Sequence, residues 1–168
     1  MKRFIPLISA VSILAAIILV TLFSHRKLLV YNYTDSLPKG LYLVMPGPVN
    51  KGDLIAFEPP PIAAELIRTR KYLRKEGVLL KQIVGVKGDS VYTKNGEFFV
   101  NGECYGGFVA TDKEGRFMPR FSFCGKLPED RVVVAIKGKV NSYDSRYFGP
   151  VPNRNILGRL RFILRTDQ

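Results

Sequence analysis

The chain has 168 residues, 46% of them hydrophobic, and a formal net charge of +12 at pH 7. This length suits one globular domain and excludes a large multidomain protein. The basic residues are spread along the chain without a zinc-finger or RNA-binding signature. We therefore interpret the charge as a solvated basic surface that suits anionic lipid, and we expect no nucleic-acid partner.

The first predicted element is an apolar run over residues 4–23, which only one proline, two serines and one threonine interrupt. Twenty helical residues span about 30 Å, the thickness of the hydrocarbon of a bilayer. We expect a transmembrane helix here, within a membrane anchor over residues 1–28 that precedes a single domain over residues 29–168. A cleaved signal peptide is the alternative, but its apolar region is normally shorter and a small-x-small site follows it.

Past residue 41 the sequence consists of short β-branched and aromatic runs between glycines and prolines, which is typical of an antiparallel β domain. Asn95-Gly96 indicates a hairpin, because a type I′ turn needs positive φ at both central residues. One helix is predicted over Ile62–Leu73, after three prolines. The predicted strands are Leu41–Met45, Asp53–Phe57, Leu79–Val86, Ser90–Thr93, Glu97–Val100, Arg131–Ile136 and Ile156–Leu164.

The two cysteines of the chain, Cys104 and Cys124, belong to a segment over residues 104–129 that is rich in glycine and aromatic residues. We expect a long excursion between strands here. An exported domain would favour a disulfide between the two thiols, worth about 3 kcal/mol in the chain-entropy model. Two unpaired buried thiols are the alternative. Cysteine, histidine and acidic residues form no metal-like cluster, so we expect neither a metal nor another cofactor.

Lys81 lies in an apolar stretch and, on a strand, shares a face with Leu79 and Ile83. A lysine with the ordinary pKa of about 10.4 is protonated and cannot accept a proton, whereas burial among apolar groups lowers that pKa. Lys81 is therefore a candidate general base. His25, the single histidine, lies beside the end of the apolar run and is poorly placed for this role.

Ser36 lies between the apolar run and the β domain, in the segment NYTDSLPKGLY over residues 32–42. From local sequence alone, an ordinary polar turn explains such a serine well. Combined with a lysine base, the same serine becomes a candidate nucleophile. The pair suggests a serine protease that works at a membrane surface.

Three longer patterns contain these residues. Residues 36–42 read Ser-x-Pro-x-Gly-x-aromatic, residues 79–89 read apolar-apolar-Lys-x-apolar-x-Gly-x-x-Gly-Asp, and residues 142–149 read Ser-x-Asp-Ser-Arg-x-x-Gly. Together they resemble the type I signal peptidase superfamily of serine/lysine proteases, and most closely its TraF-like branch, which matures conjugative pilins. Leu37, where general signal peptidases tend to carry methionine, and the missing Gly-Asp-Asn lead before Ser142 favour that branch.

The resemblance implies a mainly β fold, with a single N-terminal transmembrane helix followed by an antiparallel β signal-peptidase-like catalytic domain. It also implies catalytic roles. Ser36 would attack the scissile carbonyl, and a neutral Lys81 would take the hydroxyl proton and later deliver it to the leaving amine. The backbone N–H of Ser36 and the hydroxyl of Thr34 would form the oxyanion hole.

The third pattern implies supporting roles around the same site. Ser142 matches the family serine that hydrogen-bonds the lysine and holds its amine in line. Asp144 and Arg146 match a structural ion pair beneath the site. On their spacing alone, an ordinary turn with an exposed salt bridge would explain the last two residues equally well.

By the same resemblance the chain would be a single-pass protein of the bacterial inner membrane, with its catalytic domain on the periplasmic side. The balanced basic residues on both flanks of the apolar run leave this topology open. The expected partners are the lipid bilayer, a precursor polypeptide such as a conjugative pilin, and a conjugative transfer or secretion apparatus. The enzyme would remove a leader segment, and the residues do not decide between hydrolysis and cyclisation of the product.

Three other interpretations compete with a dedicated pilin peptidase. A general secretory signal peptidase would differ in its substrate range. A membrane-anchored assembly factor of a conjugation or secretion apparatus would need neither Ser36 nor Lys81 for its function. A self-cleaving repressor uses the same pair of residues, but the chain has no N-terminal helix-turn-helix and carries the apolar run in that place.

Overall fold

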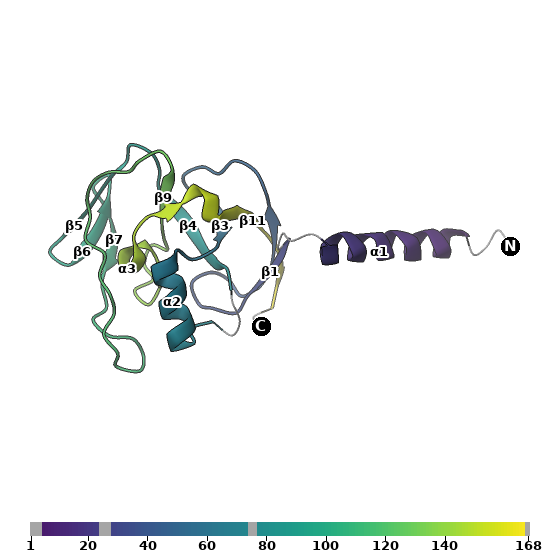
Figure 1. Ribbon diagram of the computed structural model, residues 1–168, viewed down its shortest axis with the longest axis horizontal. Helices are drawn as coiled ribbons and strands as arrows, with labels where there is room; N and C mark the ends of the chain where they lie inside the picture. The colour runs from purple at the N-terminus through teal and green to yellow at the C-terminus, as the bar shows by residue number, and fades with distance from the viewer. Residues whose placement is uncertain (1–4, 24–27, 74–76, 167–168) are drawn as a thin grey trace.

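The computed structural model describes residues 5–23, 28–73 and 77–166. Beyond its first helix the chain forms two antiparallel sheets, with two helices near the larger one (Figure 1). His25 lies outside the described residues. The helices are α1 (Ile5–Phe23), α2 (Pro61–Arg70) and α3 (Ser145–Phe148), with a 3-10 turn, η2 (Asn153–Asn155).

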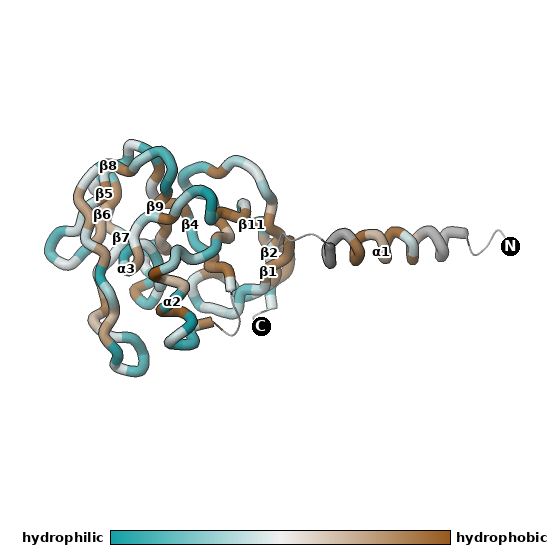
Figure 2. The backbone as a smooth tube through the Cα atoms, viewed as in Figure 1, coloured by the Kyte–Doolittle hydropathy of each residue, from teal (hydrophilic) through white to brown (hydrophobic). Residues whose placement is uncertain are grey.

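Helix α1 coincides with the predicted apolar run. Its side chains over residues 10–19 are all exposed, and its described part is mostly hydrophobic (Figure 2). Among the described residues, no helix combines the length and the apolar character needed to cross a membrane. The transmembrane helix predicted over residues 4–23 is therefore not confirmed.

The larger sheet joins strands that are distant in the sequence. Its order is β1-β2-β11-β3-β4-β9-β10, and all neighbouring strands are antiparallel. Strand β11 lies between β2 and β3, so it connects the first hairpin to the centre of the sheet. The strands are β1 (Leu29–Asn32), β2 (Gly40–Met45), β3 (Leu54–Phe57), β4 (Leu79–Gly85), β9 (Arg131–Ala135), β10 (Val151–Pro152) and β11 (Ile156–Arg165).

The smaller sheet has the order β7-β6-β5-β8. The predicted hairpin at Asn95-Gly96 is confirmed, because both residues have positive φ, 53° and 76°, in the turn between β5 and β6. The expected excursion over residues 104–129 supplies the two outer strands of this sheet. The strands are β5 (Ser90–Lys94), β6 (Glu97–Val100), β7 (Glu103–Gly107) and β8 (Cys124–Lys126).

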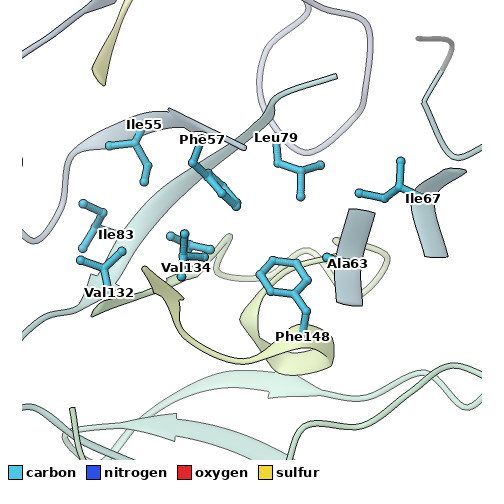
Figure 3. Close-up of a cluster of buried hydrophobic side chains, with 10 residues drawn as sticks. Ile55, Phe57, Ala63, Ile67, Leu79, Ile83, Val132, Val134 and Phe148 are labelled. Atoms are coloured by element: carbon cyan, nitrogen blue, oxygen red, sulfur yellow. The ribbon is translucent and has the colours of Figure 1, made fainter. Parts of the chain in front are cut away.

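The hydrophobic core has one layer on each face of the central strands β3, β4 and β9. On one face, side chains of these strands pack against α2 and α3 (Figure 3). On the other face, β4 and β9 pack against the smaller sheet. Lys81 on β4 shares the first face with Leu79 and Ile83, as predicted. The first layer consists of Ile55, Phe57, Ala63, Ile67, Leu79, Ile83, Val132, Val134, Phe148 and Val151.

The predicted disulfide is absent, because Cys104 and Cys124 are both free. Cys104 on β7 is opposite Phe99, and Cys124 on β8 is opposite Tyr92. Strands β6 and β5 therefore stand between the two cysteines, and three strand spacings amount to about 14 Å. A disulfide needs Cα atoms within about 7 Å. Twenty residues of sequence separation allowed a bridge, but the order of the strands prevents it.

A buried ion pair anchors the segment between β9 and α3. The Asp144 carboxylate accepts bonds from Nε and Nη2 of Arg146 at 2.9 and 3.0 Å, and both side chains are almost fully buried. The guanidinium also donates to the carbonyl oxygens of Gly107, Lys139 and Ser142. One side chain thus connects the smaller sheet, the turn after β9 and α3, so the structure corrects the alternative of an exposed salt bridge.

We predict that Arg146→Met, which keeps most of the side-chain volume, lowers the free energy of unfolding by about 3–5 kcal/mol. The reason is that the Asp144 carboxylate would remain buried without a counter-charge. Urea unfolding of the detergent-solubilised chain, followed by circular dichroism, measures the change. Arg131→Met is the matched control, because Arg131 is an exposed arginine whose nearest carboxylate oxygen, on Asp130, is 3.8 Å away. Equal unfolding midpoints for the two variants would refute this role of the pair.

Candidate active site

Ser36 lies in the loop between β1 and β2, and Asn32 at the end of β1 holds this loop. The buried Asn32 amide donates to the carbonyl oxygens of Thr34, Leu37 and Pro38 at 2.9–3.1 Å. Its Oδ1 atom accepts from the backbone N–H of Thr34 at 3.1 Å. The loop therefore closes around one side chain, which fixes the backbone on both sides of Ser36.

Strand β4 brings Lys81 to Ser36. The Nζ atom of Lys81 donates a hydrogen bond to Oγ of Ser36 at 3.1 Å, across 45 residues of sequence. Only 4% of Lys81 is exposed. Ser36 is in the loop that joins β1 to β2, whereas β4, three places beyond β2 in the larger sheet, carries Lys81. Their contact therefore depends on the order of the strands and not on any local motif.

The environment of Lys81 changes its protonation. Burial lowers the pKa of the Lys81 amine from 10.5 to about 8. The negative charge of Asp144 opposes this shift and the positive charge of Arg146 adds to it. Near neutral pH an appreciable fraction of the amine is therefore unprotonated, which is the condition for accepting a proton from a hydroxyl.

Thr34 lies in the same loop, two residues before Ser36. Its hydroxyl donates to Oδ1 of Asn32 at 2.7 Å. A hydroxyl has one proton to donate. In this structure the Thr34 proton is therefore used within the loop, and the hydroxyl must turn away from Asn32 before it can donate to a substrate oxygen.

Ser142 borders the same site from the turn after β9. Its exposed fraction is 2%, and among the described residues its Oγ atom has no hydrogen-bond partner. The expected hydrogen bond from Ser142 to Lys81 is thus not formed, although the amine, which donates to Ser36, has further protons to donate. Asp144 and Arg146 lie behind this turn, and the Arg146 guanidinium holds the Ser142 carbonyl oxygen at 3.0 Å.

These residues line a cleft of about 810 Å³. Its walls are the loop after β1, the end of α2, the start of β4, the turn over residues 138–143 and part of the segment between β7 and β8. Such a volume admits several residues of an extended polypeptide. Across the described residues, no three His, Cys, Asp or Glu side chains gather as a metal site would require.

One wall of the cleft is built from residues that sequence reasoning did not identify. The Asp112 carboxylate accepts from Tyr72 at 2.6 Å, from Arg116 at 2.8 Å and from Arg70 at 3.2 Å. Burial opposes ionisation of Asp112, but the bond from Tyr72 and those from the Arg116 backbone and side chain hold the carboxyl pKa well below its ordinary value. Arg70 also donates to the Phe117 carbonyl oxygen, which ties α2 to the excursion.

Sequence signals for these additional residues are weak. Asn32 ends a strand just before a turn, where asparagine commonly bonds the backbone two residues ahead. This signal could have identified Asn32 as the residue that organises the loop. The contacts of Asp112 with Arg70 and Tyr72 span about forty residues and a sheet crossing, so no local pattern reveals them.

The family model described as signal peptidase, peptidase S26, matches residues 1–165. A plasmid transfer protein TraF of Escherichia coli is 30% identical over 143 residues, which cover 79% of this chain and 80% of the relative. A signal peptidase I of Leptolyngbya laminosa is 28% identical over 113 residues, which cover 67% of this chain and 51% of the relative.

A crystal structure of a signal peptidase I from Enterococcus faecalis superposes with a TM-score of 0.41 and 21% identity, over 68% of this chain and 98% of that one. The match to the family model extends over almost the whole sequence and includes Ser36, Lys81 and the 142–149 segment. The chain therefore belongs to the signal peptidase family, peptidase S26.

Proposed function

We propose that this chain is a serine endopeptidase that cuts leader segments from exported precursors, with Ser36 as the nucleophile and neutral Lys81 as the general base. The observation that carries the proposal is the 3.1 Å contact between the Ser36 hydroxyl and a buried amine. Membership of the signal peptidase family supports the reaction class. A lysine accepts a proton only in its neutral form, and burial lowers the Lys81 pKa to about 8, so part of the amine is neutral near pH 7.

The proposed reaction proceeds through an acyl-enzyme. Oγ of Ser36 bonds to the scissile carbonyl carbon while its proton passes to Nζ of Lys81. The backbone N–H of Ser36 stabilises the oxyanion, joined by the Thr34 hydroxyl once it releases Asn32. The protonated lysine then gives its proton to the leaving amine as the peptide bond breaks. In hydrolysis, water attacks the ester, its proton passes to Lys81, and that proton returns to the Ser36 oxygen.

We propose a conjugative pilin as the substrate. The support is the match to a plasmid transfer protein over 80% of its length, against 51% for the Leptolyngbya signal peptidase I. A general secretory signal peptidase is the second candidate, supported by that same signal peptidase relative.

We further propose that the chain acts at the bacterial inner membrane, with the domain on the outer side, where exported precursors emerge. The support is the apolar sequence over residues 4–23, which precedes Ser36 by few residues. Attachment there would hold the nucleophile near the surface at which leader segments leave the bilayer. A net charge of +12 would add attraction to anionic headgroups.

The proposed catalytic pair is tested by mass spectrometry of a candidate pilin precursor and an ordinary secretory precursor, each incubated with the detergent-solubilised enzyme. We expect the wild type to cleave the pilin precursor, and Ser36→Ala and Lys81→Met to lose activity by about 10⁴-fold or more. Lys81→Met keeps the buried stem while removing the base. Ser90→Ala, which changes an exposed serine on β5, is the matched control and should retain full activity.

The outcomes of this assay differ in meaning. Cleavage of the pilin precursor alone supports a dedicated enzyme, and cleavage of both precursors supports a general signal peptidase. The product mass separates hydrolysis from cyclisation, which differ by one water. Cleavage that survives in Ser36→Ala or Lys81→Met would refute the proposed pair, and cleavage of neither precursor by the wild type would favour a non-catalytic assembly role.

The pH dependence of kcat/KM should follow the protonation of the Lys81 amine. Because the base must be neutral, kcat/KM should fall about tenfold per unit below pH 8 and reach a plateau above it. The unfolded chain holds this proton up to about pH 10.5, so the free energy of unfolding should rise between pH 8 and 10.5. Lys94→Gln, which removes an exposed lysine on β5, should leave both profiles unchanged. An inflection near 10.5 would contradict burial of the amine.

Membrane attachment is tested by alkaline carbonate extraction of cells that express the chain. We expect the full-length protein to stay in the membrane pellet, because its apolar N-terminal segment would remain in hydrocarbon. A variant with Leu14→Glu and Ile17→Glu should be released, because charges in hydrocarbon are unfavourable. Release of the unaltered chain would refute stable insertion.

A further inference from the structure

The cleft beside Ser36 is bordered by an excess of positive charge. Six basic side chains line it, against three acidic ones. Lys81 is one of the six and lies buried beneath the serine. The other five belong to α2 and its C-terminal cap, to the excursion between β7 and β8, and to the turn after β9. Charge of one sign therefore reaches the cleft from three separate parts of the fold.

The acidic residues of the cleft are already paired. Asp35 lies 3.0 Å from Lys39, and Asp112 bonds to both Arg70 and Arg116. Glu114 lies 2.8 Å from Arg116 as well. The remaining basic side chains of the cleft are Lys71, Lys113 and Lys139, for which no ion pair exists within the described ranges 5–23, 28–73 and 77–166. All three are exposed.

Two of these lysines lie on well-defined turns close to the proposed nucleophile. Lys113 is in the turn after Asp112, whose Oδ1 atom accepts the backbone N–H groups of Glu114 and Arg116 at 3.0 Å. The carbonyl oxygen of Lys139 accepts from the buried Arg146 guanidinium at 2.8 Å. Both backbones are therefore held in place, and only the ends of the two lysine side chains are free to adjust.

Asp35, the neighbour of Ser36, reports how near these charges are. Its pKa is lowered by the hydrogen bond and charge of Lys39, and further by the charges of Lys113 and Lys139. Charges that act on Asp35 also act on a polypeptide bound over Ser36.

We propose that Lys113 and Lys139 form a carboxylate-reading pair that selects precursors with a negative charge beside the scissile bond. The charge would come from an acidic side chain of the precursor. This inference rests on the proposed peptidase function and deepens it. A neutral segment would leave the two lysines solvated, whereas a carboxylate would gain an attraction with each of them.

Binding to the inactive Ser36→Ala enzyme tests the pair without requiring cleavage. The probes are twelve-residue alanine and glycine peptides with a neutral dye, which carry one central Glu, Gln or Lys and an amidated end. Fluorescence anisotropy gives each Kd. We expect the Glu peptide to bind about threefold to tenfold more tightly than the Gln peptide, and the Lys peptide to bind more weakly.

The decisive variants remove or reverse the charges of two lysines at a time, either in the cleft or outside it. Lys113→Ala with Lys139→Ala should remove the preference, whereas Lys94→Ala with Lys126→Ala removes two exposed lysines of the smaller sheet outside the cleft and should preserve it. Lys113→Glu with Lys139→Glu should reverse the preference toward the Lys peptide. One molar salt should abolish the preference, because the Debye screening length at that concentration is only about 3 Å.

The outcomes separate this inference from the proposed function. If both double-alanine variants lose the preference equally, the preference comes from the overall charge of the protein and the proposed pair is refuted. An unchanged preference in Lys113→Ala with Lys139→Ala would also refute it. If that variant instead loses binding only to phosphatidylglycerol vesicles, the lysines face lipid and the inference fails. In an otherwise wild-type enzyme, Lys94→Ala with Lys126→Ala should cleave precursors normally if the peptidase function holds, whatever the peptides show.

Discussion

Burial of the Lys81 amine lowers its pKa from 10.5 to about 8, which corresponds to about 3 kcal/mol against the charged form. The surrounding core must offset that penalty. Strand β4 is buried on both faces, by α2 and α3 on one side and by the smaller sheet on the other. The cover on the face that Lys81 shares with Leu79 and Ile83 keeps water from the amine, and a thinner cover there would hydrate the amine and return its proton.

Two polar side chains hold the backbone segments that carry Ser36 and Ser142. Asn32 closes the loop that carries Ser36, and Arg146 fixes the turn that carries Ser142 and Lys139. Each donates hydrogen bonds to at least three backbone carbonyl oxygens, which are groups that need a partner when they are shielded from water. The cleft thus has rigid sides built from irregular backbone, which regular strands alone would not supply.

Sequence reasoning predicted the parts of the fold that depend on local patterns. Seven strands and one helix agree with the structure to within a few residues, because alternation and turn residues act over short distances. It missed β1, β8 and β10, which are short, and β7, which lies in the expected excursion. The helix ends at Arg70, three residues before the predicted end at Leu73, because Lys71 caps it in a left-handed conformation. The order of the strands in the smaller sheet keeps the two cysteines apart, and their spacing in the sequence could not reveal this.

The place of β11 has a consequence for biosynthesis. Ser36 belongs to the β1–β2 hairpin and Lys81 to the β3–β4 pair, and β11, although late in the chain, joins the two. A growing polypeptide therefore carries both side chains long before anything aligns them. Because non-local pairing of this kind is slow and follows synthesis of the last strand, the nascent chain remains unable to act on its neighbours until translation has passed residue 165.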